Sequence, residues 1–181
     1  VGGDAGVGEV VVLRIAGPLA DQAASVVLPF LLPDTPVVAW WPGEAPPVPA
    51  QDPLGRLAVK RITDATASSD PLTAIKGRLR GYTPGDTDLA WSRVTYWRAL
   101  LASAVDQPPY EPIESALVSG LATEPALDGL AGWLASRLDC EVRRATGPLQ
   151  VQLVRSSETI TLSRPQDGVT GTLSRTGKHD A

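Results

Sequence analysis

The sequence predicts an α/β protein, α+β overall: a Rossmann-like βαβ unit with a mostly parallel sheet, followed by a smaller α+β portion with antiparallel strands. In the first half, short β-branched runs alternate with segments of helical period, which favours parallel strands joined by helices. In the second half, short strand-like runs are separated by turn signals such as "SSE" and "PQDG", which favour antiparallel hairpins. We therefore expect four segments: a flexible lead-in over 1–8, an α/β domain over 9–106, a linker over 107–112 and an α+β portion over 113–181.

Three short runs predict the strands of the first portion. "EVVVLRIAG" (9–17) is β-branched and stops at a Gly-Pro pair, as a buried strand does. "PVVAWWP" (36–42) is bounded by prolines and predicts a second short buried strand. "RITDAT" (61–66) predicts the third strand.

The segments between these strands predict helices and one long loop. "DQAASVVLPFLL" (21–32) and "LGRLAVK" (54–60) have the apolar spacing of short helices. The stretch 42–53 is rich in proline and predicts a surface loop. "DPLTAIKGRLRGY" predicts a longer helix that is capped by Asp70 and has Pro71 at its first position.

The second portion begins with a strand and a helix. "IESALVSGL" (113–121) predicts the strand, and "EPALDGLAGWLASRLD" predicts a helix with Pro125 near its start. Short strands in an antiparallel meander are then expected in "CEVRRA" (140–145), "LQVQLVRS" (149–156), "ETITLSR" (158–164) and "VTGTLSR" (169–175).

Composition excludes several function classes. A formal charge of −4 and a pI near 5.0 predict no basic surface for nucleic acid or an anionic membrane. The apolar runs stay short of the roughly 18 residues that predict a membrane span. The single cysteine, Cys140, excludes an internal disulfide, which agrees with a cytoplasmic protein. The chain starts at Val1 and contains no Met, so we expect it to be a piece of a longer protein.

Catalytic and metal chemistry find little support in the residue inventory. The one histidine, His179, lies in a polar tail, where it is badly placed for a buried triad. One Cys and one His do not supply a zinc site. An Asp or Glu base is still available, so an enzyme is unsupported rather than excluded, and no cofactor or metal is expected.

The strongest enzymatic signal is the pair of carboxylates in Asp86-Thr87-Asp88. Sugar-nucleotide transferases use such a pair to share a divalent cation with a diphosphate, but normally after an apolar strand. Here the pair follows Pro84-Gly85 and precedes a helical pattern. We therefore expect Asp86 to cap a helix over 86–106 and Asp88 to lie in its first turn.

The 3.6-residue period divides this helix into faces. A buried face is expected from Ala90, Val94, Trp97, Leu101 and Ala104, widened by Leu89, Tyr96 and Leu100. A narrower flank carries Asp88, Trp91, Thr95 and Arg98. This flank is either the edge of the core, with the Arg paired to nearby carboxylates, or a partner surface of the kind that Trp and Arg often anchor.

Two further motifs leave a structural and a functional reading open. Trp40 and Trp41 end a predicted strand, where ligands bind in open α/β sheets, but successive strand residues point to opposite faces. Only one of them can therefore line a given cleft, and packing is the simpler role. In "KRITD" (60–64), Arg61 either forms a salt bridge with Asp64 or captures an anion.

Three motifs in a fixed order, "VVAWWPGEAP", "KRITDA" and "YTPGDTDLAWSRVTYWRALLASAVDQPPYEP", resemble the glucose-6-phosphate dehydrogenase assembly protein family, OpcA, in its actinobacterial form. The resemblance extends over essentially the whole chain. It implies a non-enzymatic cytosolic partner that promotes the active oligomer of this dehydrogenase and thereby NADPH supply. The thioredoxin-type redox control that is linked to the family in cyanobacteria does not carry over as an intramolecular dithiol switch, because Cys140 is alone.

The resemblance supplies no catalytic residues, so the matched motif residues are candidates for structure or for partner contact. They are Trp40, Trp41, Arg61, Asp64, Asp86, Asp88, Trp91, Arg93, Trp97 and Arg98. The alternative from another class is an enzyme that binds a sugar phosphate or nucleotide sugar through Asp86 and Asp88. A third, intermediate hypothesis is an assembly protein that also binds a small sugar-phosphate ligand.

Overall fold

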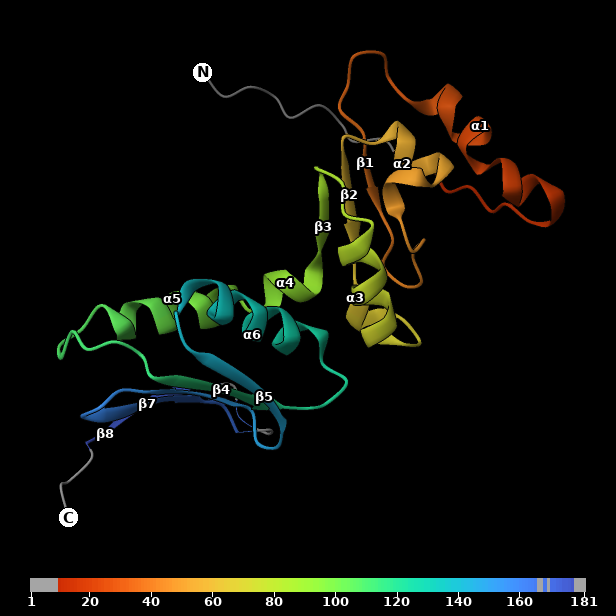
Figure 1. The fold of residues 1–181 in the computed structure, drawn as a ribbon. Coiled ribbons are helices and arrows are strands. Elements are labelled where there is room, and N and C mark those ends of the chain that lie inside the picture. The colour runs from red at the N-terminus through yellow and green to blue at the C-terminus, as the bar shows by residue number, and fades with distance from the viewer. Residues whose placement is uncertain (1–9, 166–167, 169, 178–181) are drawn as a thin grey trace.

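The computed structural model describes residues 10–165, 168 and 170–177, and its strands form two sheets (Figure 1). The lead-in expected over 1–8 and His179 lie outside the described residues. No helix in the described part of the chain is both long and apolar enough to cross a membrane. The α/β class expected from the sequence is confirmed, with one parallel and one mixed sheet.

The N-terminal sheet is parallel, as the alternation of strands and helices predicted. It consists of β1 (Val38–Trp40), β2 (Lys60–Thr63) and β3 (Asp86–Asp88) in the order β1-β2-β3. The connections contain α2 (Pro53–Leu57) and α3 (Pro71–Arg80). Asp70 caps α3 by accepting from the Thr73 N–H, and Pro71 is the first helical residue, so this prediction is confirmed.

The chain before β1 differs from the expectation. Residues 10–16 form no strand, and Val10 and Val12 are 86% and 74% exposed, so the buried strand predicted over 9–17 is wrong. A β-branched run becomes a strand when it fits a half-buried pleated surface, and this run packs on none here. The helix expected over 21–32 is broken into a 3-10 turn (Gly17–Gln22), α1 (Ala23–Val27) and a second 3-10 turn (Leu28–Phe30) that contains Pro29.

The C-terminal sheet has the order β5-β4-β6-β7-β8. Its strands are β4 (Ser115–Gly120), β5 (Glu141–Thr146), β6 (Gln150–Val154), β7 (Glu158–Ser163) and β8 (Thr172–Gly177). The predicted meander is confirmed for β6, β7 and β8, which are antiparallel. It is wrong for β5, which pairs parallel to β4 because the helix α6 (Pro125–Arg137) forms a crossover long enough to return the chain in the same direction.

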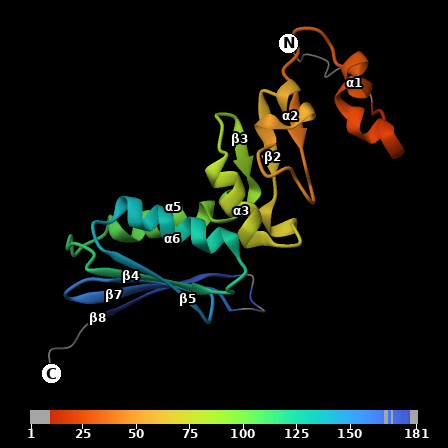
Figure 2. The same cartoon turned by 45° about the vertical axis from the view of Figure 1, so that its right-hand side comes forward.

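The main core lies between the C-terminal sheet and a layer of helices. α5 (Thr95–Val105) and α6 lie over one face of the sheet in both ribbon views (Figures 1 and 2). Alternate residues of β4, β6 and β7 point into this core and are fully or almost fully buried: Ala116, Val118, Val151, Leu153, Ile160 and Leu162. Polar residues such as Gln152 and Thr161 alternate with them, as expected for a sheet covered on one face.

The helical stretch after β3 belongs to the same core. It consists of α4 (Leu89–Arg93) and α5, so the single helix expected over 86–106 is wrong at its start, where 86–88 form β3. The predicted buried face is confirmed by Ala90, Val94, Leu101 and Ala104, with Trp97 partly buried against the core. The prediction that further side chains widen this buried face is wrong at two positions, because Tyr96 and Leu100 are 81% and 47% exposed. The division at 106/107 stays a prediction.

Two arginines, one in the turn between β6 and β7 and one on β8, hold the end of α5 against the C-terminal sheet. The fully buried Arg155 donates to the Val105 carbonyl at 2.7 Å and pairs with Glu158 at 3.0 Å. Arg175 donates to the Ala104 carbonyl at 2.6 Å and to the Pro108 carbonyl at 2.8 Å. The last carbonyls of a helix lack partners inside it, and here guanidinium groups of the sheet provide them.

We expect Leu101→Ala to lower the free energy of unfolding by about 2–5 kcal/mol, because it opens a cavity at a side chain that is 1% exposed. Leu100→Ala is the matched control, since this neighbour is 47% exposed and should cost far less. Urea denaturation of both variants measures the difference. Equal losses would contradict the placement of α5 in this core.

Candidate functional site

The candidate site begins with the pairing of β2 and β3. Arg61 lies opposite Asp86 and Thr63 opposite Asp88 in the parallel register. Because alternate strand residues share a face, this register brings two carboxylates, a guanidinium and a hydroxyl to one side of the sheet. The DTD motif and the RITD motif, 25 residues apart, thus form one polar cluster.

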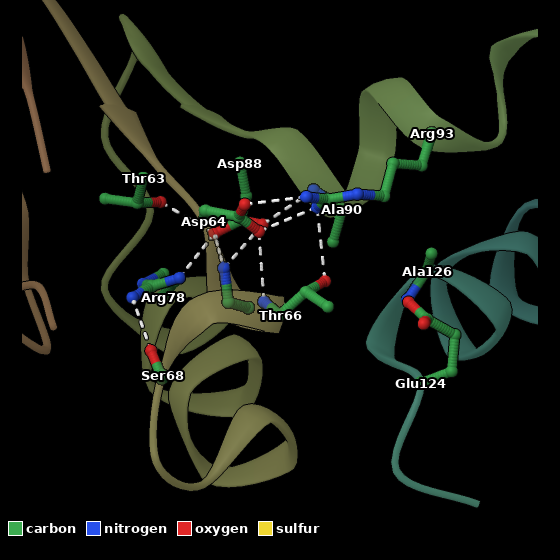
Figure 3. Close-up of polar contacts among 11 residues, drawn as sticks. Thr63, Asp64, Thr66, Ser68, Arg78, Asp88, Ala90, Arg93, Glu124 and Ala126 are labelled. Carbon is green, nitrogen blue, oxygen red and sulfur yellow. Dashed lines mark hydrogen bonds and ion pairs between the residues drawn. The ribbon is translucent and has the colours of Figure 1, made fainter. Parts of the chain in front are cut away.

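The Asp88 carboxylate is the centre of this cluster (Figure 3). It accepts from the Thr63 hydroxyl at 2.7 Å and from the Arg78 guanidinium at 2.5 Å. It also accepts from the backbone N–H of Ala65 at 3.1 Å and of Ala90 at 2.9 Å. A buried charge is tolerated when it is paired and fully hydrogen-bonded, and these donors come from β2, the turn after it, α3 and α4.

Asp86 and the backbone before it hold Arg61. The Arg61 Nε pairs with the Asp86 carboxylate, and its two terminal nitrogens donate to the Ala58 carbonyl at 2.8 Å and the Pro84 carbonyl at 2.7 Å. Gly85 has φ +100°, and a Cβ there would lie 2.5 Å from the Val59 carbonyl oxygen and 2.9 Å from an Arg61 nitrogen. The glycine of the PGDTD motif is therefore required by this close approach.

Asp64 connects the turn after β2 to α4. Its carboxylate accepts from both terminal nitrogens of Arg93 at 2.7 Å, a bidentate pair, and from the Thr66 N–H at 3.1 Å. The Arg93 hydrogen bonds hold the pKa of Asp64 below its ordinary value, although partial burial acts in the opposite direction. The same pair raises the pKa of Arg93.

Two expectations for these motifs are corrected by the geometry. Asp86 does not cap a helix, because it lies in β3; the cap of α4 is Asp88. Arg61 and Asp64 do not form a salt bridge, because Arg61 is held by Asp86 and Asp64 by Arg93. Both DTD carboxylates are occupied by guanidinium groups, and among the described residues no group of three His, Cys, Asp or Glu is placed to hold a metal.

The flank of Trp91 and Arg98 forms a stacked pair. The Arg98 guanidinium carbon lies 3.8 Å from the centre of the Trp91 ring, a cation–π geometry, and its Nη2 donates to Thr95 at 3.1 Å. Trp91 is 39% exposed. The stack fixes a planar guanidinium beside an exposed aromatic ring, which are the two groups that most often anchor protein interfaces.

Trp91 also lines a cleft of about 770 Å³ between α3 and α6. Most of its wall is apolar, with Ile75 and Leu79 from α3 opposite Ala126 and Gly129 from α6. Arg78 and the DTD residues also border it. The polar cluster therefore lies beside an apolar cleft, and both are built from the same elements.

The remaining sequence candidates lie apart from this cluster. Trp40 is 59% exposed on β1, whereas the neighbouring Trp41 is half-buried. The backbone N–H of Trp41 donates to the Ile62 carbonyl at 2.9 Å. Trp97 packs against the main core. The structure thus brings together Arg61, Asp64, Asp86, Asp88 and Arg93, and separately Trp91 and Arg98.

Sequence reasoning missed Arg78, which is 8% exposed and holds Asp88. Its guanidinium also donates to Ser68 at 3.3 Å. A signal was present, because Arg78 follows Ile75 by three residues and so shares the apolar face of the predicted helix. A charge at such a position needs a buried partner.

Comparison with known families agrees with the motif resemblance. Residues 1–80 match the family model described as the glucose-6-phosphate dehydrogenase subunit N-terminal domain, and 84–181 match the C-terminal domain of the same subunit. The chain belongs to the OpcA family. These descriptions support association with glucose-6-phosphate dehydrogenase and point to an assembly subunit rather than a catalyst. None of the curated proteins or solved structures compared with the chain gives a match.

We expect Asp88→Ala to cost about 3–5 kcal/mol of stability, because it leaves the buried Arg78 charge without its carboxylate. The control is Asp70→Ala, which removes the exposed cap of α3 and should cost about 0.5–2 kcal/mol. Denaturant melts compare the two. A loss at Asp88 no larger than that at Asp70 would contradict its central role.

The Asp64–Arg93 pair should contribute to stability in a pH-dependent way. Since the folded pKa of Asp64 is lowered, the contribution is present above the unfolded value of about 3.9 and is lost as pH falls through the folded pKa. We expect Arg93→Ala to raise the pKa of Asp64, measured by NMR titration of its carboxyl carbon. Arg98→Ala is the control and should leave this pKa unchanged. The assignment fails if the two variants give the same Asp64 pKa.

Proposed function

We propose that this chain is a non-enzymatic assembly and activator protein of glucose-6-phosphate dehydrogenase. It binds the dehydrogenase and favours its active oligomer, and so acts as an allosteric activator that supports NADPH production in the oxidative pentose phosphate pathway. We propose that it does so in the cytoplasm. The family matches over 1–80 and 84–181 support the association, and the finer role is our inference.

The observation that carries the proposal at the level of residues is the Trp91–Arg98 stack. A ring and a guanidinium that are already fixed against each other lose little side-chain entropy when a partner covers them. The stack lies on α4 and α5, which are anchored by the buried Ala90, Val94 and Leu101. A rigid, partly exposed Trp and Arg on an anchored helix is a suitable interface anchor.

The mechanism needs no chemistry by the chain. A protein that binds one oligomer of an enzyme more tightly than the others shifts the enzyme toward that oligomer, by an amount set by the difference in affinity. The carboxylates of the DTD motif then have a structural task. They hold Arg61 and Arg78 and so keep β3 and α4 in place beneath the stack.

We expect Trp91→Ala and Arg98→Ala to keep the fold yet reduce stimulation of the dehydrogenase, because each removes half of the stacked pair. The assay is dehydrogenase activity at increasing concentrations of each variant, with stability checked by denaturant melts. Tyr110→Ala and Arg143→Ala serve as matched controls, since these side chains are exposed and lie outside the stack. Normal stimulation by both folded stack variants would show that the stack is part of the scaffold.

A further inference from the structure

We propose that the cleft between α3 and α6 receives an amphipathic helix of the dehydrogenase, one with an apolar stripe and an acidic residue at its edge. This inference rests on the proposed function and goes further, because it assigns a neighbouring surface, which shares Trp91 with the stack, and a type of partner segment. The cleft of about 770 Å³ is lined mainly by apolar groups, and Leu79 and Tyr82 at its border are 71% and 62% exposed. Large apolar side chains in such a position typically mark interaction sites.

The α6 wall is suited to a helix. Ala126, Gly129 and Gly132 line the cleft at three-residue spacing. Ala126 is 3% exposed and the Trp91 ring lies against Gly129, so the open part of this wall is at Gly132. A Cβ added at Gly132 would meet no atom within 4 Å, which leaves room for a backbone to approach closely. An apolar face laid into a groove of this kind is a common mode of helix recognition.

Charge at the cleft defines the polar edge of the partner. The carboxylates that border the cleft are already engaged: Asp86 by Arg61, Asp88 by Arg78, and Asp128 by Arg144 at 3.0 Å. Lys76 on α3 also lines the cleft and is exposed, and among the described residues no carboxylate forms an ion pair with it. Asp70 interacts with this charge without a contact ion pair, so the exposed Lys76 favours an acidic residue on the incoming helix.

The decisive experiment measures binding of the intact chain to purified dehydrogenase by isothermal titration calorimetry. Gly132→Phe fills the cleft and should weaken binding about tenfold or more, whereas Gly132→Ala should bind nearly as the wild type does. Lys76→Glu should also weaken binding, with Lys60→Glu, on β2, as the charge-matched control. Denaturant melts establish that each variant is folded.

A photo-reactive residue in place of Leu79 provides a readout that does not depend on Gly132→Phe folding. We expect cross-links to a dehydrogenase peptide that forms an amphipathic helix with an acidic edge. Cross-links to a strand or loop of the dehydrogenase, or to a second copy of this chain, would overturn the inference.

The outcomes separate the two proposals. If the wild type does not bind the dehydrogenase, the proposed function fails and this inference fails with it. If the wild type binds and folded Gly132→Phe binds equally well, the cleft inference alone fails. Loss of binding in Gly132→Phe and Lys76→Glu, with both controls intact, supports the helix in the cleft.

Discussion

The Asp88 carboxylate, whose side chain is only 9% exposed, is the constraint on which the rest of this structure depends. A charge removed from water must gather donors, and its donors come from four segments: β2, the turn after it, α3 and α4. Their positions are therefore fixed relative to one another. Because α4 continues into α5, whose Leu101 and Ala104 are buried over the C-terminal sheet, the same carboxylate also fixes how the two sheets are joined.

Local pattern predicted the parts of the fold that depend on period and capping. The parallel strands β1 and β2, the Asp70 cap of α3 and the buried face of α5 were all expected from the sequence. The signals are local, because a helix face repeats within four residues and a cap acts within three. The same reasoning wrongly placed Asp86 in a helix. The extended backbone at 86–88 is set by pairing with β2, which a local pattern does not reveal.

Partners that are distant in sequence could not be predicted in this way. Nothing near Arg61 indicates that its carboxylate lies 25 residues away at Asp86, rather than three residues away at Asp64. The exposed run at 10–13 has the composition of a strand but no neighbour to pack against. The parallel return of β5 depends on the length of the α6 crossover. In each case the decisive interaction is tertiary, and propensity is only a weak guide to it.

The functional account follows from where charge and apolar surface lie. The carboxylates that suggested a metal-dependent enzyme are bound by arginines inside the protein, so they position elements and are not free for substrate. The exposed groups are instead Trp91, stacked on Arg98, and the apolar side chains around the neighbouring cleft. Such a surface suits a binding protein whose effect on an enzyme arises from differential affinity.

The central claim is that binding of this chain shifts the oligomers of glucose-6-phosphate dehydrogenase. Sedimentation velocity measures it most directly, with the dehydrogenase near the midpoint of its own subunit dissociation and the chain added in increasing amounts. The expected result is growth of the larger, active oligomer with this chain co-sedimenting. An unchanged distribution at saturating chain, or co-sedimentation with the smaller species, would contradict the account.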